Sequence, residues 1–556
     1  MNSRFFESHR DTLEKAVQAI QQRGYWSPFS EMPSPKVYGE TANDDGKRAF
    51  ESRLNAYFEI DQPGTVGTVG SEVSPYGMKL GITYPKIDAD ALLPAMMEAK
   101  ESWARTSRDT RAGVCLEILS RLNKRSFEIA YAVHHTTGQA FMMAFQAGGP
   151  HAQDRALEAI AYAYEEMKRV PATATWEKPQ GKNPPLSMIK TYYLVPRGIG
   201  LVIGCCTFPT WNSYPGMFAS LMTGNAVLAK PHPGAILPMA LTVETARQVL
   251  SEAGFDPNIV CLAAEDPGGT LAPELALRPE VGIIDFTGSS ANGNWLEQHA
   301  HQARVYTEKA GVNPIVIDSA QDFKGVARNI AFTLSLYSGQ MCTTPQNIFV
   351  PRDGIAVDGG KMSFDEVAEA ICGGIQKLLG DRERAVEIIG ALQNDGVMER
   401  LERARNTGKI LLDSEKVEHS RYPDARIATP LVVQLDAERD GETYREEWFG
   451  PVYFIIATDS TEQSLRLAAD TAREQGAITF SVYSTDEKVL EAAERSAIEG
   501  GVPLSCNLTG GVFVNQSAAF SDYHGTGANP SANTCLTDSD FVAGRFTIVQ
   551  SRRHAA

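Results

Sequence analysis

The 556-residue sequence lacks the features that mark membrane, secreted and nucleic-acid-binding proteins. It has no long apolar run and a mean hydropathy of -0.23, which argues against a membrane-spanning helix. Its first residues, 1–7, carry no basic region followed by an apolar core, so we expect no signal peptide. The net charge of -16 disfavours nonspecific binding to nucleic acid. These absences favour a cytoplasmic enzyme with no nucleic acid and no membrane among its partners.

Metal-binding and nucleotide-binding patterns are missing as well. The eight cysteines form no C-x-x-C pair and no H-E-x-x-H run occurs, so we expect no metal site. In a chain of this size without a secretion signal, the cysteines are expected to be reduced. There is no G-x-G-x-x-G run, which argues against an ordinary dinucleotide fingerprint.

The sequence does contain a long alternation of strand and helix patterns. Helical spacing of apolar residues occupies 6–23 and 88–167, and a polar, proline-bearing break follows at 171–185. The later elements are expected as strands at 188–195, 200–205, 226–229, 259–263, 281–286, 314–317, 347–350, 478–483 and 546–551, with helices at 211–222, 238–250 and 323–337. This alternation predicts an α/β protein with parallel sheets that carry helices on both faces. The length predicts two or three domains.

Two short runs carry the most informative chemistry. Cys342 lies in Tyr-Ser-Gly-Gln-Met-Cys-Thr-Thr-Pro at 337–345, and Glu308 lies in Tyr-Thr-Glu-Lys-Ala-Gly at 306–311. A thiol can attack a carbonyl carbon, and a carboxylate can activate the water that follows. Taken alone, Cys342 could be an inert buried thiol and Glu308 a charge at a strand end. Together they favour acyl chemistry.

A phosphate-binding turn is predicted where the strand 281–286 ends in Thr-Gly-Ser. Gly288 lets backbone approach a phosphate, and the helix after Ser289 begins with free N–H groups that attract an anion. The alternative is a turn that uses these residues only for geometry and capping. Lys230 follows the strand 226–229, at the sheet edge where open α/β proteins bind ligands. A solvated surface lysine is the alternative there.

A series of short motifs resembles the aldehyde dehydrogenase superfamily in order and spacing. These motifs lie at 195–200, 208–209, 222–225, 228–231, 286–289, 308, 339–342 and 447–451. The resemblance implies two Rossmann-like parallel-sheet domains and a small bridging β-arm for oligomerisation, in a homodimer or homotetramer. The implied boundaries are 1–183 and 197–310 for an NAD(P)-binding domain with an N-terminal extension, 311–520 for the catalytic domain, and 184–196 with 535–556 for the arm.

The resemblance also implies a role for each candidate residue. Cys342 is the implied nucleophile, and Glu308 is the implied general base that releases an acid from a cysteine thioester. Contacts to the cofactor are implied for Lys230 at the adenosine ribose or its phosphate, Gly288 and Ser289 at the pyrophosphate, and Glu447 and Phe449 at the nicotinamide ribose.

Two positions depart from the family pattern. The family binds the oxyanion with the asparagine of an Asn-Phe-Pro run, and an ungapped register to Lys230 places Thr207 there. The hydroxyl of Thr207 and the backbone N–H of Cys342 could each donate a hydrogen bond to the oxyanion. Asn212 resembles another form of the motif but requires a gap, so Thr207 is preferred and Asn212 is the alternative. The second departure is Lys-Ala at 309–310, where the family usually has Leu-Gly.

Cofactor choice can be argued from the residues after Lys230. Members that prefer NAD commonly carry a glutamate three positions later, where it binds the ribose 2′-hydroxyl. In this chain that position is Pro233, and His232 lies beside it. A 2′-phosphate would meet two potential cations and no carboxylate. The sequence therefore predicts NADP, with NAD as the alternative.

Some runs suggest a subgroup. The long N-terminal segment, Cys-Cys-Thr-Phe-Pro at 205–209 and Tyr-His-Gly-Thr-Gly at 523–527 resemble the ring-opening aldehyde dehydrogenases of bacterial phenylacetic acid degradation. That likeness implies a small-molecule aldehyde that is CoA-linked, a semialdehyde of aromatic catabolism. A CoA-acylating dehydrogenase is a rival, although such relatives usually lack the carboxylate that Glu308 provides. A non-catalytic relative that binds nucleotide or a pathway partner is the third reading, kept open by Thr207.

Overall fold

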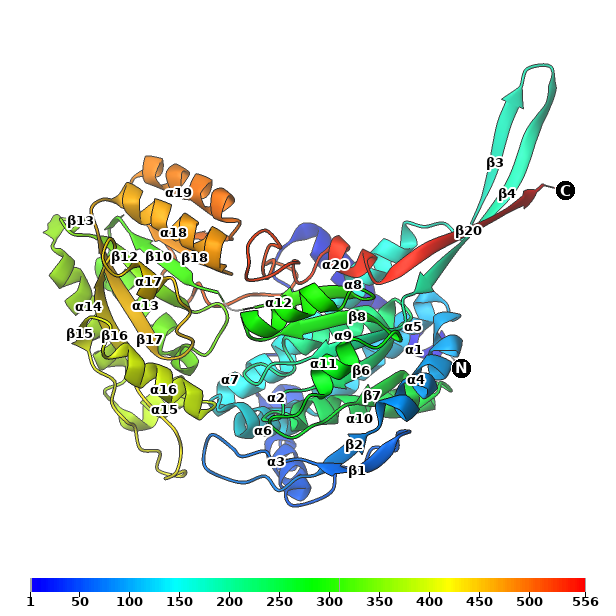
Figure 1. Ribbon diagram of the computed structural model, residues 1–556, viewed down its shortest axis with the longest axis horizontal. Helices are drawn as coiled ribbons and strands as arrows, with labels where there is room; N and C mark the ends of the chain where they lie inside the picture. The colour runs from blue at the N-terminus through cyan, green and yellow to red at the C-terminus, as the bar shows by residue number, and fades with distance from the viewer. Residues whose placement is uncertain (1–2, 310, 556) are drawn as a thin grey trace.

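The computed structural model describes residues 3–309 and 311–555. These residues form two domains, each built around a largely parallel sheet, and an antiparallel arm that projects from the first domain (Figure 1). The α/β fold predicted from the strand–helix alternation is confirmed. Across the described ranges, every helix is too short or too polar to span a bilayer.

The sheet of the first domain brings the candidate cofactor residues to one edge. Its strands run in the order β7 (Val260–Leu262), β6 (Ala226–Lys230), β5 (Ile199–Ile203), β8 (Val281–Thr287) and β9 (Arg304–Glu308), with all neighbours parallel. One face is covered by α9 (Ser213–Met222) and α10 (Leu237–Glu252), the other by α4 (Ala89–Ala104) and α12 (Ser290–His299). Because parallel strands end at the same edge, Lys230, Gly288 and Glu308 emerge on one side of the domain.

The second domain repeats this architecture with a wider sheet, on the left of Figure 1. Its strand order is β15 (Lys409–Leu412), β16 (Leu431–Asp436), β17 (Val452–Thr458), β12 (Pro345–Pro351), β10 (Asn313–Ile317), β18 (Phe480–Tyr483) and β19 (Leu504–Cys506). Ile315 and Ile317 pack towards α13 (Phe323–Ser335) and α14 (Phe364–Leu378), whereas Val316 packs towards α18 (Thr461–Gln475). Burial of alternate side chains on both faces explains why β10 reads as a continuous apolar run.

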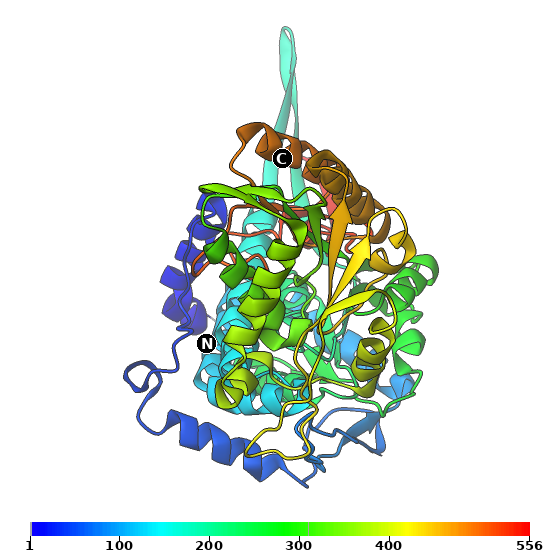
Figure 2. The same ribbon diagram turned by 90° about the vertical axis from the view of Figure 1, so that its left-hand side faces the viewer.

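The arm consists of β20 (Phe546–His554), β4 (Asn183–Pro196) and β3 (Thr173–Gln180), in that order and antiparallel. Figures 1 and 2 show the β3–β4 hairpin extending away from the body. The strand β3 corrects the prediction of a polar break at 171–185. Its residues are mostly exposed and polar, so no apolar alternation marks it, and backbone pairing with β4 holds it in place. Residues 535–545, assigned to the arm from the sequence, contain α20 (Ser539–Ala543) and pack on the first domain.

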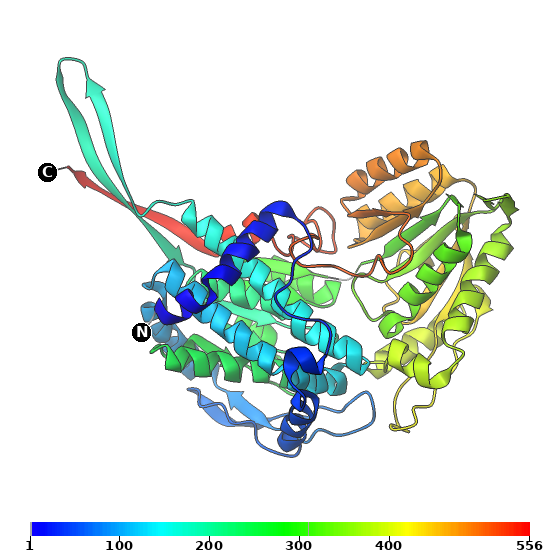
Figure 3. The same cartoon turned by 180° about the vertical axis from the view of Figure 1, so that it is seen from behind.

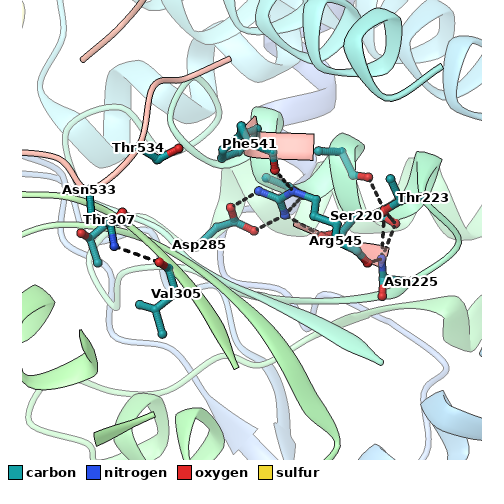
Figure 4. A network of polar contacts seen from close by, with 12 residues as sticks. Ser220, Thr223, Asn225, Asp285, Val305, Thr307, Asn533, Thr534, Phe541 and Arg545 are labelled. Atoms are coloured by element: carbon teal, nitrogen blue, oxygen red, sulfur yellow. Dashed lines mark hydrogen bonds and ion pairs between the residues drawn. The ribbon is translucent and has the colours of Figure 1, made fainter. Parts of the chain in front are cut away.

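A buried ion pair anchors the arm strand β20 to the first domain (Figure 4). Arg545 precedes β20 and donates to both carboxylate oxygens of Asp285 on β8, at 2.8 and 2.5 Å. Its guanidinium also donates to Ser220 Oγ at 2.8 Å, and its carbonyl accepts from Asn225 Nδ2 at 3.1 Å. Arg545 is fully buried, so this pair fixes where β20 leaves the core.

We expect Asp285→Asn to lower the free energy of unfolding by about 3–5 kcal/mol, because it leaves a buried guanidinium without its counter-charge. Urea unfolding followed by circular dichroism measures the loss. The control is the double variant Asp285→Asn with Arg545→Met, which buries no unpaired charge and should recover much of the stability. A single variant as stable as the wild type would show that the pair does not hold the arm.

The N-terminal helix and the segment that precedes the last arm strand both pack on the first domain. The N-terminal helix α1 (Ser3–Gln22) lies along α5 (Arg108–Lys124) and α8 (Ala152–Lys168), as Figure 3 shows from behind. After β19 the chain follows an irregular path back towards β9. There the Asn533 side chain accepts from Thr307 N–H at 2.8 Å and donates to the Val305 carbonyl at 2.9 Å (Figure 4). The C-terminal segment therefore lies directly against the strand that ends in Glu308.

Candidate active site

Cys342 lies in a tightly turned loop between α13 and β12. Tyr337 and Ser338 both have a φ of 51°, a left-handed conformation that costs a non-glycine residue energy. Buried hydrogen bonds offset that cost: the Tyr337 hydroxyl donates to the Thr137 carbonyl at 2.6 Å, and the Ser338 hydroxyl donates to a backbone carbonyl at 2.9 Å. The loop that carries the thiol is therefore held rigidly from the neighbouring elements.

Glu308 is the last residue of β9 and is only 2% exposed. Asn212 Nδ2 donates to its Oε2 at 2.8 Å, and His524 Nε2 donates to its Oε1 at 3.0 Å. Burial raises the pKa of Glu308, but His524, the Cys342 thiol and Asn212 together outweigh burial and leave the pKa below its usual value. The carboxylate is ionised at neutral pH and can accept a proton.

The thiol of Cys342, in contrast to the Glu308 carboxylate, is protonated at rest. Burial, followed by the negative charge of Glu308, raises the pKa of Cys342 well above its ordinary value. The resting group is therefore a thiol, and a nearby base must remove its proton before it can attack. Glu308 is the base in reach. The structure thus brings together the two residues that the sequence singled out.

A third group at this point was not assigned a role from the sequence. His524 Nε2 lies 3.7 Å from Cys342 Sγ, and ligand atoms of Glu308, Cys342 and His524 all lie within 4.8 Å of one another. The sequence, with no role for His524, did not indicate that these three groups meet. The signal available in the sequence was a histidine in a glycine-rich run at 523–527 that no family role explains.

The structure brings Asn212, rather than Thr207, to the reacting carboxylate. The Thr207 hydroxyl points to Cys205 Sγ at 3.9 Å, and its carbonyl accepts from Gln139 Nε2 at 2.8 Å. Asn212 immediately precedes α9, and its side chain contacts Glu308 directly. The geometry favours the alternative over the sequence-based preference, because the path of the loop between β5 and α9 brings Asn212 to Glu308.

A cavity of about 550 Å³ opens beside Cys342 between the two domains. Its wall is mostly apolar and aromatic, with contributions from Trp26, Phe29, Met143, Trp211, Phe332 and Leu336. The acidic residues in the wall include Glu31, which pairs with His151, and Asp154, whose pKa burial raises well above its usual value. No lysine or arginine is among the described residues that line the cavity. The N-terminal extension, through residues 25–31, thus forms part of the wall. The size is typical of a site for a small ligand.

Lys230 ends β6 as predicted but has an unexpected partner. It is 4% exposed and forms an ion pair with Glu265, which follows β7. The reading as a solvated surface lysine is therefore wrong. His232 is also altered, because burial and the Lys230 charge lower its pKa to about 4, so it is neutral at pH 7. The sheet order places β7 beside β6, and this adjacency supplies a carboxylate that the local sequence did not reveal.

Gly288 and Ser289 connect β8 to α12 in the predicted strand–turn–helix context. The Ser289 hydroxyl caps α12 by accepting from Asn292 N–H at 3.4 Å. A Cβ at position 288 would lie 2.8 Å from the ring of Phe286, so a larger residue there would have to displace that ring. Free N–H groups at the start of a helix attract anions, and phosphate binding at this turn stays a prediction.

The departure at Lys309 has a structural explanation. Its Nζ lies 3.0 Å from Glu297 Oε1 and 2.9 Å from Asn294 Oδ1, both on α12. The lysine therefore ties the end of β9 to the helix that begins at the phosphate turn. The neighbouring departure, Ala310, lies outside the described residues.

Glu447 and Phe449 lie on the other side of the Cys342 loop. Both line a small cavity that also includes Cys342 and Gly311. Burial raises the pKa of Glu447 to about 7, although its Oε1 accepts from Gly311 N–H at 3.3 Å. A buried carboxyl with one backbone partner can take a further hydroxyl donor, which fits a ribose. Contact of Glu447 and Phe449 with the nicotinamide ribose stays a prediction.

Comparison with known proteins decides the family. The protein-family model described as "Aldehyde dehydrogenase family" matches residues 73–527. The chain belongs to the aldehyde dehydrogenase family. Among curated relatives of this aldehyde dehydrogenase, 1-pyrroline-5-carboxylate dehydrogenase of Bacillus subtilis (strain 168) is 23% identical over 437 residues, with 76% of this chain and 78% of the relative covered. N-succinylglutamate 5-semialdehyde dehydrogenase of Paraburkholderia xenovorans (strain LB400) is 27% identical over 392 residues, with 69% and 74% covered.

Solved structures agree with this assignment. An NAD-dependent aldehyde dehydrogenase from Burkholderia multivorans has a TM-score of 0.98 and 64% identity, with 100% of this chain and 99% of that chain covered. Thermus 1-pyrroline-5-carboxylate dehydrogenase with bound NAD shares the fold at a TM-score of 0.74 and 20% identity, with 96% and 99% covered. The protein is an oxidoreductase of the aldehyde dehydrogenase type that uses NAD(P). These relatives carry the names of pyrroline-carboxylate and semialdehyde dehydrogenases, so the subgroup predicted from 205–209 and 523–527 stays a prediction.

Proposed function

We propose that this aldehyde dehydrogenase converts a small-molecule aldehyde into the carboxylic acid through a thioester on Cys342. The observation that carries the proposal is that an ionised Glu308 lies within 4.8 Å of the Cys342 thiol, which lines the cavity between the two domains. Glu308 takes the thiol proton, and the sulfur attacks the aldehyde carbon. A bound nicotinamide supplies the hydride acceptor that the oxidation needs. Lys230, Gly288, Ser289, Glu447 and Phe449 are the residues that would hold this cofactor.

Oxyanion stabilisation is assigned to Asn212 and to the backbone N–H of Cys342. The amide of Asn212 carries two hydrogens, and Glu308 uses one of them. The second is available to the oxygen that becomes negative when sulfur attacks. Thr207, which the sequence favoured for this role, contacts the Cys205 sulfur instead.

Hydrolysis completes the reaction. Water attacks the thioester carbon as Glu308 takes its proton, the new C–O bond forms, and the C–S bond breaks. Cys342 leaves as a thiolate and is reprotonated. The rival in which CoA resolves the thioester has no need of a carboxylate beside the thiol, and the two contacts that orient Glu308 therefore favour water as acceptor.

The cavity favours an uncharged aldehyde with an apolar or aromatic body. Its apolar wall can bury such a body. The phosphates of a CoA-linked substrate, or a carboxylate on a semialdehyde, would find no lysine or arginine among the described lining residues. A CoA-linked semialdehyde, expected from the subgroup likeness, would have to keep its CoA portion outside this cavity.

The test of this proposal is product analysis across an aldehyde panel with and without free CoA. Formation of reduced cofactor is followed by fluorescence for uncharged aromatic, carboxylate-bearing and CoA-linked aldehydes. Free acid as the product in both conditions, with the highest kcat/KM for the uncharged aromatic members, is expected. An acyl-CoA product would establish the acylating rival, and a preference for CoA-linked aldehydes would restore the substrate predicted from the sequence.

For the cofactor, the structure leads us to favour NAD over the NADP predicted from the sequence. That prediction assumed no carboxylate near the ribose and two cations, yet Glu265 pairs with Lys230 and His232 is neutral at pH 7. A 2′-phosphate would approach the Glu265 carboxylate, whereas a 2′-hydroxyl could donate to it. The Burkholderia multivorans structure, described as NAD-dependent, supports this choice.

We expect Glu265→Gln to shift binding preference towards NADP by about tenfold or more, equivalent to about 1.4 kcal/mol, because it removes one negative charge at the ribose. Calorimetric titration of NAD and NADP into the wild type and the variant measures the shift. Glu274→Gln, which removes an exposed carboxylate from α11 (Leu271–Ala276), is the matched control. Tighter binding of NADP by the wild type would contradict the choice of NAD.

The arm supports a homo-oligomer as part of the same proposal. Several of its apolar side chains are exposed in the single chain: Leu186, Ile189, Tyr193, Val195, Ile548 and Val549. Such a surface on a projecting sheet is suited to burial against another copy. Molar mass from light scattering distinguishes a homodimer from a homotetramer. A cytoplasmic location, expected from the sequence, belongs to this proposal too.

A further inference from the structure

The C-terminal segment inserts a histidine between the two reacting residues. His524 is 2% exposed, and its Nε2 contacts both Glu308 Oε1 at 3.0 Å and Cys342 Sγ at 3.7 Å. The segment that carries it runs between the second domain and the arm, and none of the motifs that mark the family contains it. A buried polar ring in contact with both the base and the nucleophile requires a physical explanation.

The hydrogen-bond network assigns the proton on the ring. An ionised carboxylate can only accept, so the nitrogen that faces Glu308, Nε2, must carry the hydrogen. The other nitrogen, Nδ1, is buried and has no hydrogen-bond partner among the described residues. The network therefore places an N–H on Nε2, and that N–H faces both the Glu308 carboxylate and the Cys342 sulfur.

The ring is held where it is by the fold rather than by its contacts with the reacting groups. His524 N–H donates to the Leu536 carbonyl at 3.1 Å, and the Leu536 N–H donates back at 2.9 Å. Ala532 of the same segment pairs with Glu308 itself, and Trp211 packs edge-on against the imidazole with centroids 4.7 Å apart. The strand that carries the base thus also positions the histidine, as a preorganised site requires.

We propose that His524 is a catalytic residue whose Nε2–H stabilises the Cys342 thiolate each time it forms. When Glu308 takes the thiol proton, its carboxylate becomes neutral and a weaker acceptor, and the sulfur becomes an anion. The N–H then donates to sulfur instead of to Glu308, so no buried negative charge is left without a partner. After attack, sulfur is neutral. Glu308 releases the former thiol proton to bulk water, and the N–H then returns to its carboxylate for the hydrolytic step.

The same exchange operates when the acid is released. Water loses a proton to Glu308, the C–O bond forms, and the C–S bond breaks to give the thiolate again. The N–H of His524 once more moves from the newly protonated carboxyl to the leaving sulfur. The histidine keeps its proton throughout, so it acts as a donor that alternates between two acceptors. The titratable groups around the site are Glu308, Cys342 and Cys205, and the last two are neutral thiols at rest.

The experiment measures thiolate formation without turnover. Alkylation of Cys342 by iodoacetamide is followed by mass spectrometry in the free enzyme as a function of pH, for the wild type, His524→Ala and His524→Gln. We expect His524→Ala to slow alkylation at neutral pH by about tenfold or more and to shift its pH profile upward, since one hydrogen bond to a charged group is lost. Glutamine places an N–H near the position of Nε2 and should restore most of the rate.

Several controls separate this role from a structural one. His9→Ala, on α1 and bonded to Glu117, should leave alkylation unchanged. Thermal unfolding and calorimetric NAD binding report whether the variants fold, and a folded His524→Gln keeps the test valid if alanine does not fold. Alkylation of a folded His524→Ala at the wild-type rate and pH profile would overturn the proposal. Equal slowing in the alanine and glutamine variants would also overturn it, because a packing role, not the N–H, would then be responsible.

Discussion

Replacing Cys342 with alanine is expected to abolish aldehyde oxidation, by more than about 10⁴-fold in kcat, while cofactor affinity stays nearly unchanged. The reason is that the sulfur forms the covalent bond to the substrate, whereas the implied cofactor contacts lie on β6, on the β8–α12 turn and in the loop that contains Glu447. Formation of reduced cofactor, measured by fluorescence, gives the rate, and calorimetry gives the affinity.

The matched control for this variant is Cys506→Ser, which changes a half-buried cysteine on β19. It should retain wild-type activity. Substantial turnover by the Cys342 variant would reject the assignment of the nucleophile. Cys205 and Cys206 would then become candidates, although burial raises the pKa of both thiols.

Glu308→Gln is expected to form the thioester and then to resolve it about 10²–10⁴-fold more slowly than the wild type. The amide keeps the shape of the side chain but cannot take a proton from water. The expected trace is one equivalent of reduced cofactor per active site, released more slowly than in the wild type because the thiol also loses its proton to Glu308, followed by near-arrest. Rapid-mixing fluorescence measures both phases.

The pH dependence of the wild type provides an internal check on this base. Because the pKa of Glu308 is lowered, its carboxylate persists below the pH at which an ordinary glutamate gains a proton. The rate of thioester hydrolysis should therefore stay nearly constant as pH falls through that range. It should decrease only when pH reaches the lowered pKa of Glu308. An unchanged steady-state rate in Glu308→Gln would remove its role as base and reopen the CoA-acylating mechanism.

Local patterns were sufficient for much of the fold and for the reacting pair. Strands such as β6, β8 and β10 are buried because both faces of each sheet are covered by helices. Their residues are therefore mostly apolar, and such runs can be recognised in the sequence. Cys342 and Gly288 each sit in a short run whose geometry is set by near neighbours: a left-handed turn before the thiol, and a strand–turn–helix at the phosphate site. The residues that could be predicted are those whose surroundings lie within a few positions of them.

The arm strand β3 shows where such local patterns end. It has no covered face, so neither apolar alternation nor burial distinguishes it from a polar connection. The sequence could not decide between Asn212 and Thr207 either, because the path of the loop between β5 and α9 determines which side chain reaches Glu308.

What the sequence by itself determined was the α/β architecture, the family likeness, and the thiol and carboxylate of an acyl-transfer site. Only the tertiary structure decided which other groups act on them. Glu265 reaches Lys230 because β7 lies beside β6, and His524 reaches Glu308 across 216 positions because the C-terminal segment pairs with β9. Charge, tautomer and pKa depend on such contacts through space, and these contacts form only when separate segments of the chain pack together.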